Sequence, residues 1–185
     1  MHTKEELYSN KIFFNAALPL VKVIANDVPS LKKQFAHVHA IIQVSAKDPD
    51  APGGKVGMHF VVNSDEWLVH LNKVDPHPHV ELEFKSVEAM NAFFKGKMSP
   101  ATLPKMKGVV THFGAFKAFL MTLLKMSSLL GATEAPKDEA TKELMVKCFF
   151  YLLSSGISQL NKMGHEDIHD WTSKSPDRVY AWAVD

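Results

Sequence analysis

A cluster of histidine and acidic residues near the C-terminal end forms the most specific chemical motif in the sequence. His165-Glu166-Asp167-Ile168-His169 matches H-E-x-x-H, in which two imidazoles one helical turn apart bind zinc and the glutamate acts as a general base. A catalytic zinc ion also needs a third protein ligand and a dry cavity, whereas polar residues flank this motif and only 16 residues follow it. We therefore favour a polar helix end and keep a zinc-dependent hydrolase with metal ligands His165 and His169 as the alternative.

A second group of imidazoles is predicted on one face of a β-sheet. Side chains alternate between the two faces of a strand, and this alternation places five histidines on the face opposite the apolar one: His37, His39, His59, His70 and His79. The same face receives Gln43, Asn63, Glu81 and Glu83. A solvated sheet face is the favoured explanation; the alternatives are a subunit interface, a cover for the apolar C-terminal helix, and a site for a transition metal.

The remaining composition limits the chemistry further. The one cysteine, Cys148, excludes an internal disulfide and a four-thiolate zinc site, and its apolar surroundings predict a buried, unreactive thiol. The chain has 21 basic and 20 acidic residues, a formal net charge of +1. This balance argues against nucleic acid and against anionic lipid surfaces as partners. We predict no cofactor.

The length of 185 residues predicts a single domain over residues 1–185. We divide it into an N-terminal helical region (1–35), a core (36–131) and a C-terminal extension with a helix and a terminal strand (138–185). No signal peptide is evident in the opening MHTKEELYSNK, and the apolar runs are shorter than the roughly 20 residues that a transmembrane helix needs. We expect a cytoplasmic protein without a transmembrane segment.

Helical and strand periodicities alternate along the first half of the chain. Residues 4–35 are predicted to be helical, with an interruption at Pro19 and with Asp27 as the N-cap of a short second helix. A period of two then predicts strands over residues 36–45, 56–62, 67–71 and 80–84, the first three as an antiparallel meander. Leu71 is expected to face inward at the end of the third strand.

The stretch from residue 86 to residue 130 contains the features on which a functional prediction depends. A helix should start at the N-cap Ser86 and end at Gly96, and a shorter one should run from Ser99-Pro100 toward Met106. After Gly108, residues 109–113 are predicted to form a fifth strand. The following helix places its largest apolar residues on one stripe: Phe116, Phe119, Leu120, Leu123, Leu124 and Leu130.

This order of elements resembles the sterol carrier protein 2 (SCP2) family. The resemblance spans residues 36–130 and is carried by HVELEF leading into FFKGKMSP, by LPKMKGVV, and by the apolar helix 115–130. It implies an α+β fold, in which helices cover one face of a mostly antiparallel five-stranded sheet, with extra N- and C-terminal helices in this chain. It also implies an apolar tunnel, lipid transport and no catalytic residue.

The resemblance further implies which residues would line that tunnel. They are Phe93, Phe94, Met98, Leu103, Met106, Phe113, Phe116, Phe119, Leu120 and Leu123. We therefore predict non-catalytic binding of a sterol, fatty acid or acyl-CoA. The rival prediction is a ligand-free interaction module that forms a homodimer through the apolar helix at 139–163.

Overall fold

The computed structural model describes residues 13–94, 97–130, 132, 134 and 136–163. These residues fall into two compact units: one contains Val21–Thr133, and the other contains the described residues up to Leu20 and from Glu134 onward. The prediction of one domain over residues 1–185 stays a prediction, and each unit is described separately below.

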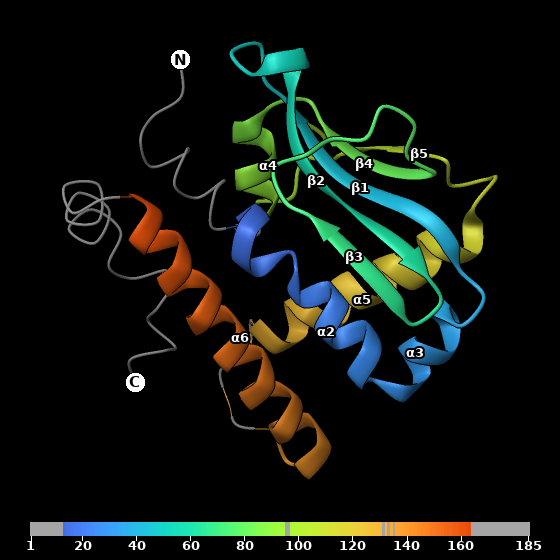
Figure 1. Cartoon of the computed structure of the whole chain (residues 1–185), viewed down its shortest axis with the longest axis vertical. Coiled ribbons are helices and arrows are strands. Elements are labelled where there is room, and N and C mark those ends of the chain that lie inside the picture. Colours follow the sequence, from blue (N-terminus) through green and yellow to red (C-terminus); the bar gives the residue numbers. More distant parts are fainter. Residues whose placement is uncertain (1–12, 95–96, 131, 133, 135, 164–185) are drawn as a thin grey trace. The chain divides into compact units, whose positions relative to one another are not determined.

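A five-stranded sheet organises the first unit (Figure 1). Its strands are β1 (His39–Lys47), β2 (Lys55–Asn63), β3 (Glu66–His70), β4 (Val80–Phe84) and β5 (Lys105–Lys107), in the spatial order β3-β2-β1-β4-β5. The short 3-10 helix η2 (Pro52–Gly54) joins β1 to β2. The predicted meander is confirmed, since β1 pairs with β2 and β2 with β3 in antiparallel fashion.

The sheet is mixed, so the predicted mostly antiparallel arrangement is wrong. β4 lies beside β1 and runs parallel to it, while β5 pairs with β4 in antiparallel fashion. The cause is the connection formed by residues 71–79, which leaves β3 at one edge and passes β2 and β1 before β4 begins. A parallel pair requires such a crossover, whereas the sequence pattern of residues 71–79 resembles an ordinary loop.

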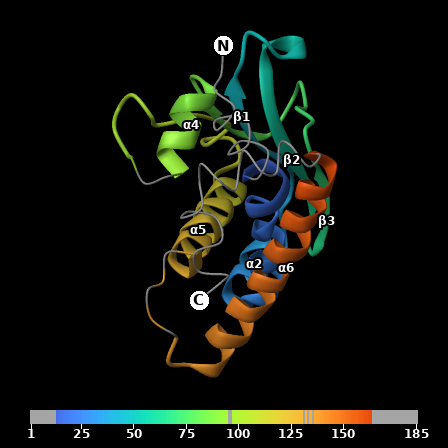
Figure 2. The same ribbon diagram turned by 90° about the vertical axis from the view of Figure 1, so that its left-hand side faces the viewer.

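Helices cover the apolar face of this sheet. The helix α3 (Pro29–Phe35) packs against α5 (Phe113–Leu130), and both α5 and α4 (Val87–Phe94) contact β1; α2 (Leu20–Asp27) precedes them in the chain. Figure 2 shows α4 and α5 on the same side of the sheet. The core between the layers contains edge-to-face aromatic pairs, for example Phe60 with Trp67 at 5.5 Å and Phe35 with Trp67 at 4.7 Å between ring centroids.

Several local predictions differ from the structure. Ser86 does cap α4, because the Ala89 N–H donates to its Oγ at 3.1 Å. The cap of α3 is Val28, with Pro29 in the first turn, and Asp27 ends α2 instead. The fifth strand comes earlier than predicted, at Lys105–Lys107, and no helix forms between Ser99 and Met106. Leu71 is exposed, because β3 has already ended at His70.

The second unit contains the π-helix η1 (Phe13–Ala17) and the helix α6 (Glu139–Met163), which pack against each other. Leu144 and Cys148 are buried one turn apart on α6, as predicted for the cysteine. Val146 and Phe150 on the same helix are exposed. None of the helices that the structure describes is long and apolar enough to cross a membrane.

Candidate functional site

Large apolar side chains are exposed along one continuous piece of the chain, residues 97–113, which we call the apolar edge segment. It contains the edge strand β5 and the turns on both sides of it. Five of its six large apolar side chains are exposed: Met98 (70%), Leu103 (53%), Met106 (55%), Val110 (96%) and Phe113 (59%). Runs of exposed apolar side chains are uncommon on soluble proteins and mark surfaces that bind something.

Specific local contacts fix this segment in place. The Thr102 hydroxyl donates to the Lys97 carbonyl at 2.7 Å, and the Ser99 N–H donates to the same hydroxyl at 2.9 Å, which closes a tight turn. After β5, Gly108 adopts a positive φ of 74°. A Cβ atom at Gly108 would lie 1.8 Å from the His79 carbonyl oxygen, so only glycine fits where the segment leaves the sheet.

The long helix α5 continues the exposed apolar surface. It turns its smaller residues toward the protein interior, with Ala115, Ala118 and Thr122 buried, and adds Phe119 and Met126 to the same buried face. Leu120, Met121 and Leu124 are exposed as a result. The buried face is thus rotated from the predicted stripe, because small residues let the helix approach the sheet closely.

The ten residues expected to line a ligand site occupy three kinds of environment. Exposed positions are Met98, Leu103, Met106, Phe113 and Leu120; half-buried positions are Phe93, Phe94 and Leu123; buried positions are Phe116 and Phe119. The structure brings Phe93 and Phe94 together with Phe84 of β4, at ring-centroid distances of 5.4 and 5.6 Å. Phe119 instead packs against Phe60 of β2, at 6.1 Å, within the core.

The opposite face of the sheet is polar, as predicted, but it is not simply solvated. Residues 71–79 cross it: the backbone carbonyl of Lys73 lies 2.8 Å from His59 Nδ1, and the Asp75 N–H donates to Gln43 Oε1 at 2.6 Å. His59, Gln43, Glu81 and Glu83 are consequently buried. The prediction of a solvated face is therefore wrong for these four residues, although the face itself was assigned correctly.

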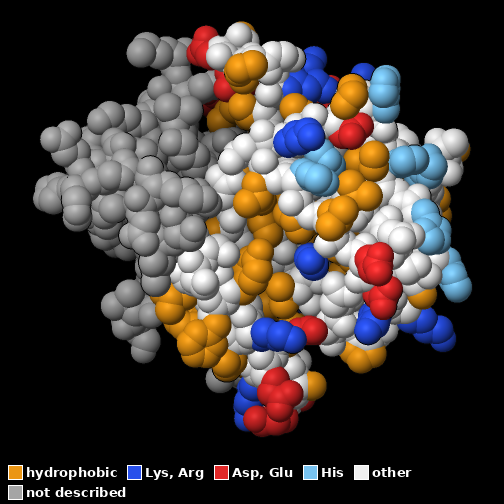
Figure 3. All heavy atoms as spheres, in the orientation of Figure 1, with side chains coloured by type: hydrophobic (Ala, Val, Ile, Leu, Met, Phe, Trp, Pro, Cys, Tyr) orange, Lys and Arg blue, Asp and Glu red, His pale blue; other side chains and the backbone are white. Residues whose placement is uncertain are grey.

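Three histidines of this face take part in two ring pairs, one of them with His112 from the turn before α5. His59 stacks on His70 with 4.6 Å between ring centroids, and His79 meets His112 edge to face at 4.9 Å. The Ile41 N–H donates to Nδ1 of His79 at 2.9 Å. His37 lies in a turn before β1. Figure 3 shows pale-blue histidine side chains gathered toward the right-hand side of the surface drawn there.

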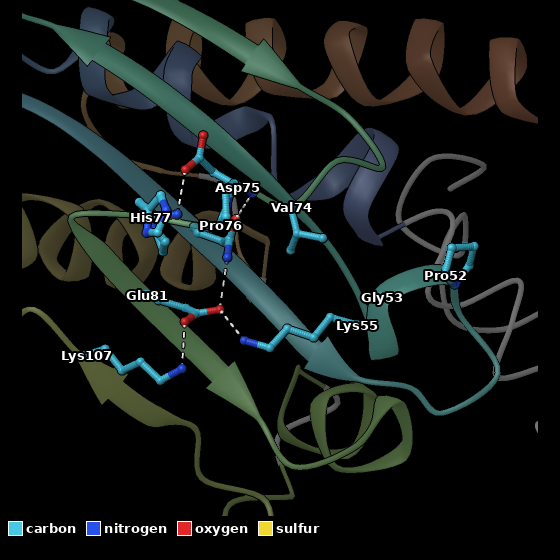
Figure 4. Close-up of a pocket in the computed structure, with 11 residues that line it drawn as sticks. Pro52, Gly53, Lys55, Val74, Asp75, Pro76, His77, Glu81 and Lys107 are labelled. Atoms are coloured by element: carbon cyan, nitrogen blue, oxygen red, sulfur yellow. Dashed lines mark hydrogen bonds and ion pairs between the residues drawn. The ribbon is translucent and has the colours of Figure 1, made fainter.

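A surface pocket of about 610 Å³ opens beside the crossing residues (Figure 4). Its lining consists of Gln43, Pro52, Gly53, Lys55, Val74, Asp75, Pro76, His77, Pro78, Glu81 and Lys107. Glu81 Oε1 accepts hydrogen bonds from Ser45 Oγ at 2.6 Å, Gln43 Nε2 at 2.9 Å and Lys55 Nζ at 3.2 Å. Its Oε2 accepts one from Lys107 Nζ at 2.9 Å.

Both lysines also contact Glu83, so the four residues form one alternating ion-pair network. Burial raises the pKa of the Glu81 carboxyl, but the hydrogen bonds from Ser45, Lys107, Gln43 and Lys55 outweigh burial and lower it to about 2. Burial raises the pKa of Glu83 as well, but the hydrogen bonds and charges of Lys107 and Lys55 together outweigh burial and lower that pKa. The two lysines and the two carboxylates neutralise one another. Because they come from β2, β4 and β5, the network links these three strands.

Sequence reasoning missed this network, although a signal for it was present. Glu81 and Glu83 alternate on one strand, and Lys105 and Lys107 alternate on another. Opposite charges at matching spacing favour cross-strand pairing, and the register does pair Glu81 with Lys107 and Glu83 with Lys105.

A transition-metal site was one of the alternatives predicted for the histidine-rich sheet face. The described residues contain no group of three histidine, cysteine, aspartate or glutamate side chains placed to hold a metal ion. His165, Glu166 and His169 lie outside the described residues, so the predicted alternative of a zinc site there stays a prediction.

Comparison with solved structures returns a resemblance of the kind expected from the sequence. The crystal structure of sterol carrier protein 2 matches with a TM-score of 0.42 and 11% sequence identity, over 70% of this chain and 97% of that one. The structural resemblance is to sterol carrier protein 2. A conserved hypothetical protein from Thermus thermophilus, described as a possible sterol carrier protein, matches with a TM-score of 0.37 and 9% identity, over 74% of this chain and 86% of that one.

No protein-family model matches the sequence, and no curated protein matches it. The two structural matches concern the arrangement of the chain and say nothing about what it binds.

Proposed function

We propose that the chain binds and transfers an apolar ligand of the sterol, fatty acid or acyl-CoA type, without catalysing a reaction on it. The observation that carries the proposal is the exposure of Met98, Leu103, Met106 and Phe113 in a segment whose first turn is closed by its own hydrogen bonds. Exposed apolar surface on a fixed backbone can bind an apolar ligand without first being reorganised.

The ligand contacts in this proposal are eight of the ten residues predicted from the sequence, without the buried core residues Phe116 and Phe119. Phe93, Phe94 and Leu123 are half-buried and add partly accessible apolar side chains to the exposed ones. Burying a methylene group contributes about 0.8 kcal/mol, so an acyl chain of about twelve carbons can reach micromolar affinity after the losses of association.

The experiment is a titration of the delipidated whole chain with a fluorescent fatty acid, after native mass spectrometry of the protein as purified. We expect co-purified lipid, saturable binding, and a loss of about tenfold in affinity for Phe113→Ser, which removes an exposed aromatic ring from the apolar edge segment. Phe150→Ser on α6 is the matched control, since Phe150 is 62% exposed and Phe113 is 59% exposed. Absence of both co-purified lipid and saturable binding contradicts the proposal.

The second candidate function is a ligand-free module that forms a homodimer. Val146 and Phe150, one helical turn apart and exposed on α6, favour it. In that case sedimentation shows a stable dimer that Phe150→Ser converts to a monomer, and native mass spectrometry shows no bound lipid. The same two variants therefore separate the carrier from the module.

A further inference from the structure

Basic and acidic residues are distributed unevenly along the chain. Between Glu88 and Glu134 there are six lysines and no acidic residue, although the whole chain has 21 basic and 20 acidic residues. Residues 89–133 therefore carry a formal charge of +6, which leaves −5 for the rest of the chain. The small net charge of +1 conceals a basic region that includes the whole apolar edge segment.

Lysines of this region alternate along the chain with the exposed apolar side chains. Lys97 and Lys105 are exposed within the apolar edge segment, and Lys117 is exposed one turn into α5. Lys107 is different, because its ammonium group is already bound by Glu81 and Glu83. Three exposed lysines thus accompany five exposed apolar side chains in the stretch 97–117.

Val110 is the most exposed of the apolar residues in this segment. Its side chain is 96% exposed, so it contributes nothing to the core of the protein. It follows the sharp turn at Gly108, which fixes where the chain leaves the sheet edge. A branched apolar side chain held outward in this way gains free energy only when another surface covers it.

We propose that the apolar edge segment is the surface through which the chain docks on an anionic lipid bilayer. Met98, Leu103, Val110 and Phe113 enter the headgroup region, while lysine ammonium groups meet the anionic headgroups. The inference rests on the proposed function for its purpose, because a carrier must meet the membrane that supplies its ligand. Its physical basis, the charge and exposure of residues 97–117, is independent of that function.

The charge pattern favours a bilayer over the other possible partners. A second copy of this chain would bring the same lysines face to face, and like charges across an interface oppose association. Nucleic acid would satisfy the lysines but would leave Val110 and Phe113 without an apolar partner. An anionic bilayer satisfies both kinds of side chain at once.

The first experiment measures flotation of the whole chain with lipid vesicles. Vesicles of phosphatidylcholine with about a third phosphatidylserine should bind the protein at low salt, while vesicles of phosphatidylcholine alone should bind it weakly. Raising the salt concentration should release the protein, because salt screens exposed charges. Equal binding to both kinds of vesicle overturns the proposal.

Charge-reversed variants test the surface itself. Each lysine near an anionic bilayer strengthens partitioning by about fivefold, so changing Lys97, Lys105 and Lys117 together to Glu should weaken it by at least about a hundredfold. The matched control changes Lys32, Lys47 and Lys73 to Glu, since these exposed lysines lie outside the segment. An equal loss in both triple variants shows that only net charge matters and overturns the proposal.

A single apolar substitution separates docking from ligand binding. Val110→Asp should weaken vesicle binding by at least about tenfold yet leave fatty-acid affinity unchanged, because Val110 is not among the proposed ligand contacts. Leu68→Asp, at a side chain 63% exposed on β3, is the control. If fatty-acid binding is absent but Val110→Asp still weakens docking, the carrier function fails and the docking surface stands. If Val110→Asp instead dissociates a dimer and leaves vesicle binding intact, the docking proposal fails.

Discussion

Two neighbouring regions of the first unit reverse the usual distribution of polar and apolar groups. On the polar face of the sheet, the carboxylates Glu81 and Glu83 are buried. Along the apolar edge segment, Val110 and Phe113 are exposed. Strand β5 contributes to both regions, since Lys107 joins the carboxylates and Met106 between the two lysines is exposed.

The two regions differ in whether their side chains have partners within the protein. Each buried carboxylate contacts both Lys55 and Lys107, so the charges stabilise one another and the strands that carry them. The exposed apolar side chains gain nothing from their position in the isolated chain. A buried polar cluster with its partners is therefore structural, whereas exposed apolar groups on a fixed backbone indicate an interface.

The largest expected effect comes from Gly108→Ala, which breaks the junction of the two regions. The new Cβ would lie 1.8 Å from the His79 carbonyl oxygen and would impose strain at a φ of 74°. We expect unfolding in urea to show a loss of about 4 kcal/mol, the sum of left-handed strain and overpacking.

Gly53→Ala is the control for this substitution. Gly53 also has a positive φ, of 79°, but a Cβ there meets no atom within 4 Å. It should cost only about 1 kcal/mol. Equal losses for the two variants would mean that backbone strain alone matters and that the contact between Gly108 and His79 is unimportant.

The next largest effect is expected for Glu81→Gln, which removes the central charge of the polar region. Its folded-state pKa of about 2 lies below the ordinary value of 4.5, a difference worth on the order of 3 kcal/mol of stability at neutral pH. Because the folded pKa is lowered, this stability is complete above about pH 4.5 and is lost as the pH falls toward 2.

Urea unfolding between about pH 2 and pH 7 checks this prediction. The variant should be less stable at neutral pH and should lose less stability on acidification than the unmodified chain. Glu66→Gln, at an exposed position on β3, should change neither property. Parallel pH profiles for the chain and for Glu81→Gln would show that the carboxylate does not hold the polar region together.

A smaller loss is expected for His59→Ala, which weakens the cover over the polar face. The substitution removes the hydrogen bond to the Lys73 carbonyl and the stacking on His70, a loss of about 2 kcal/mol. Hydrogen exchange of residues 71–79 should accelerate, while exchange in β4 and β5 changes little. His77→Ala provides the control, because the exposed His77 ring takes no part in these contacts.

The sequence predicts local structure well where the signal is periodic. Alternation identified β1 to β4, and Ser86 identified the start of α4, because both depend on residues close together in the chain. The parallel pairing of β4 with β1 was not foreseen, since strand periodicity contains no information about which strand becomes a neighbour.

The exposed residues of the candidate site could not be predicted from the sequence either. The residues of α5 are apolar on more than one side, so ranking them by size selected Leu120 and Leu124 for the interior. The helix instead buries Ala115 and Ala118, because small side chains permit close packing on the sheet. Exposure of an apolar residue depends on this packing, and it therefore became visible only in the structure.

The smallest effect on stability is expected for Met106→Ser. Met90→Ser is the comparison, because Met90 is a buried methionine and Met106 an exposed one. Met106 is 55% exposed, so its replacement should change the free energy of unfolding by less than about 0.5 kcal/mol. Met90 is fully buried, and the same substitution should cost at least about 3 kcal/mol. Fatty-acid affinity should change in the opposite order, with Met106→Ser the weaker binder at a temperature where both variants are folded. A large decrease in the free energy of unfolding for Met106→Ser would show that this side chain stabilises the fold. The exposure of the apolar edge segment would then no longer indicate an interface.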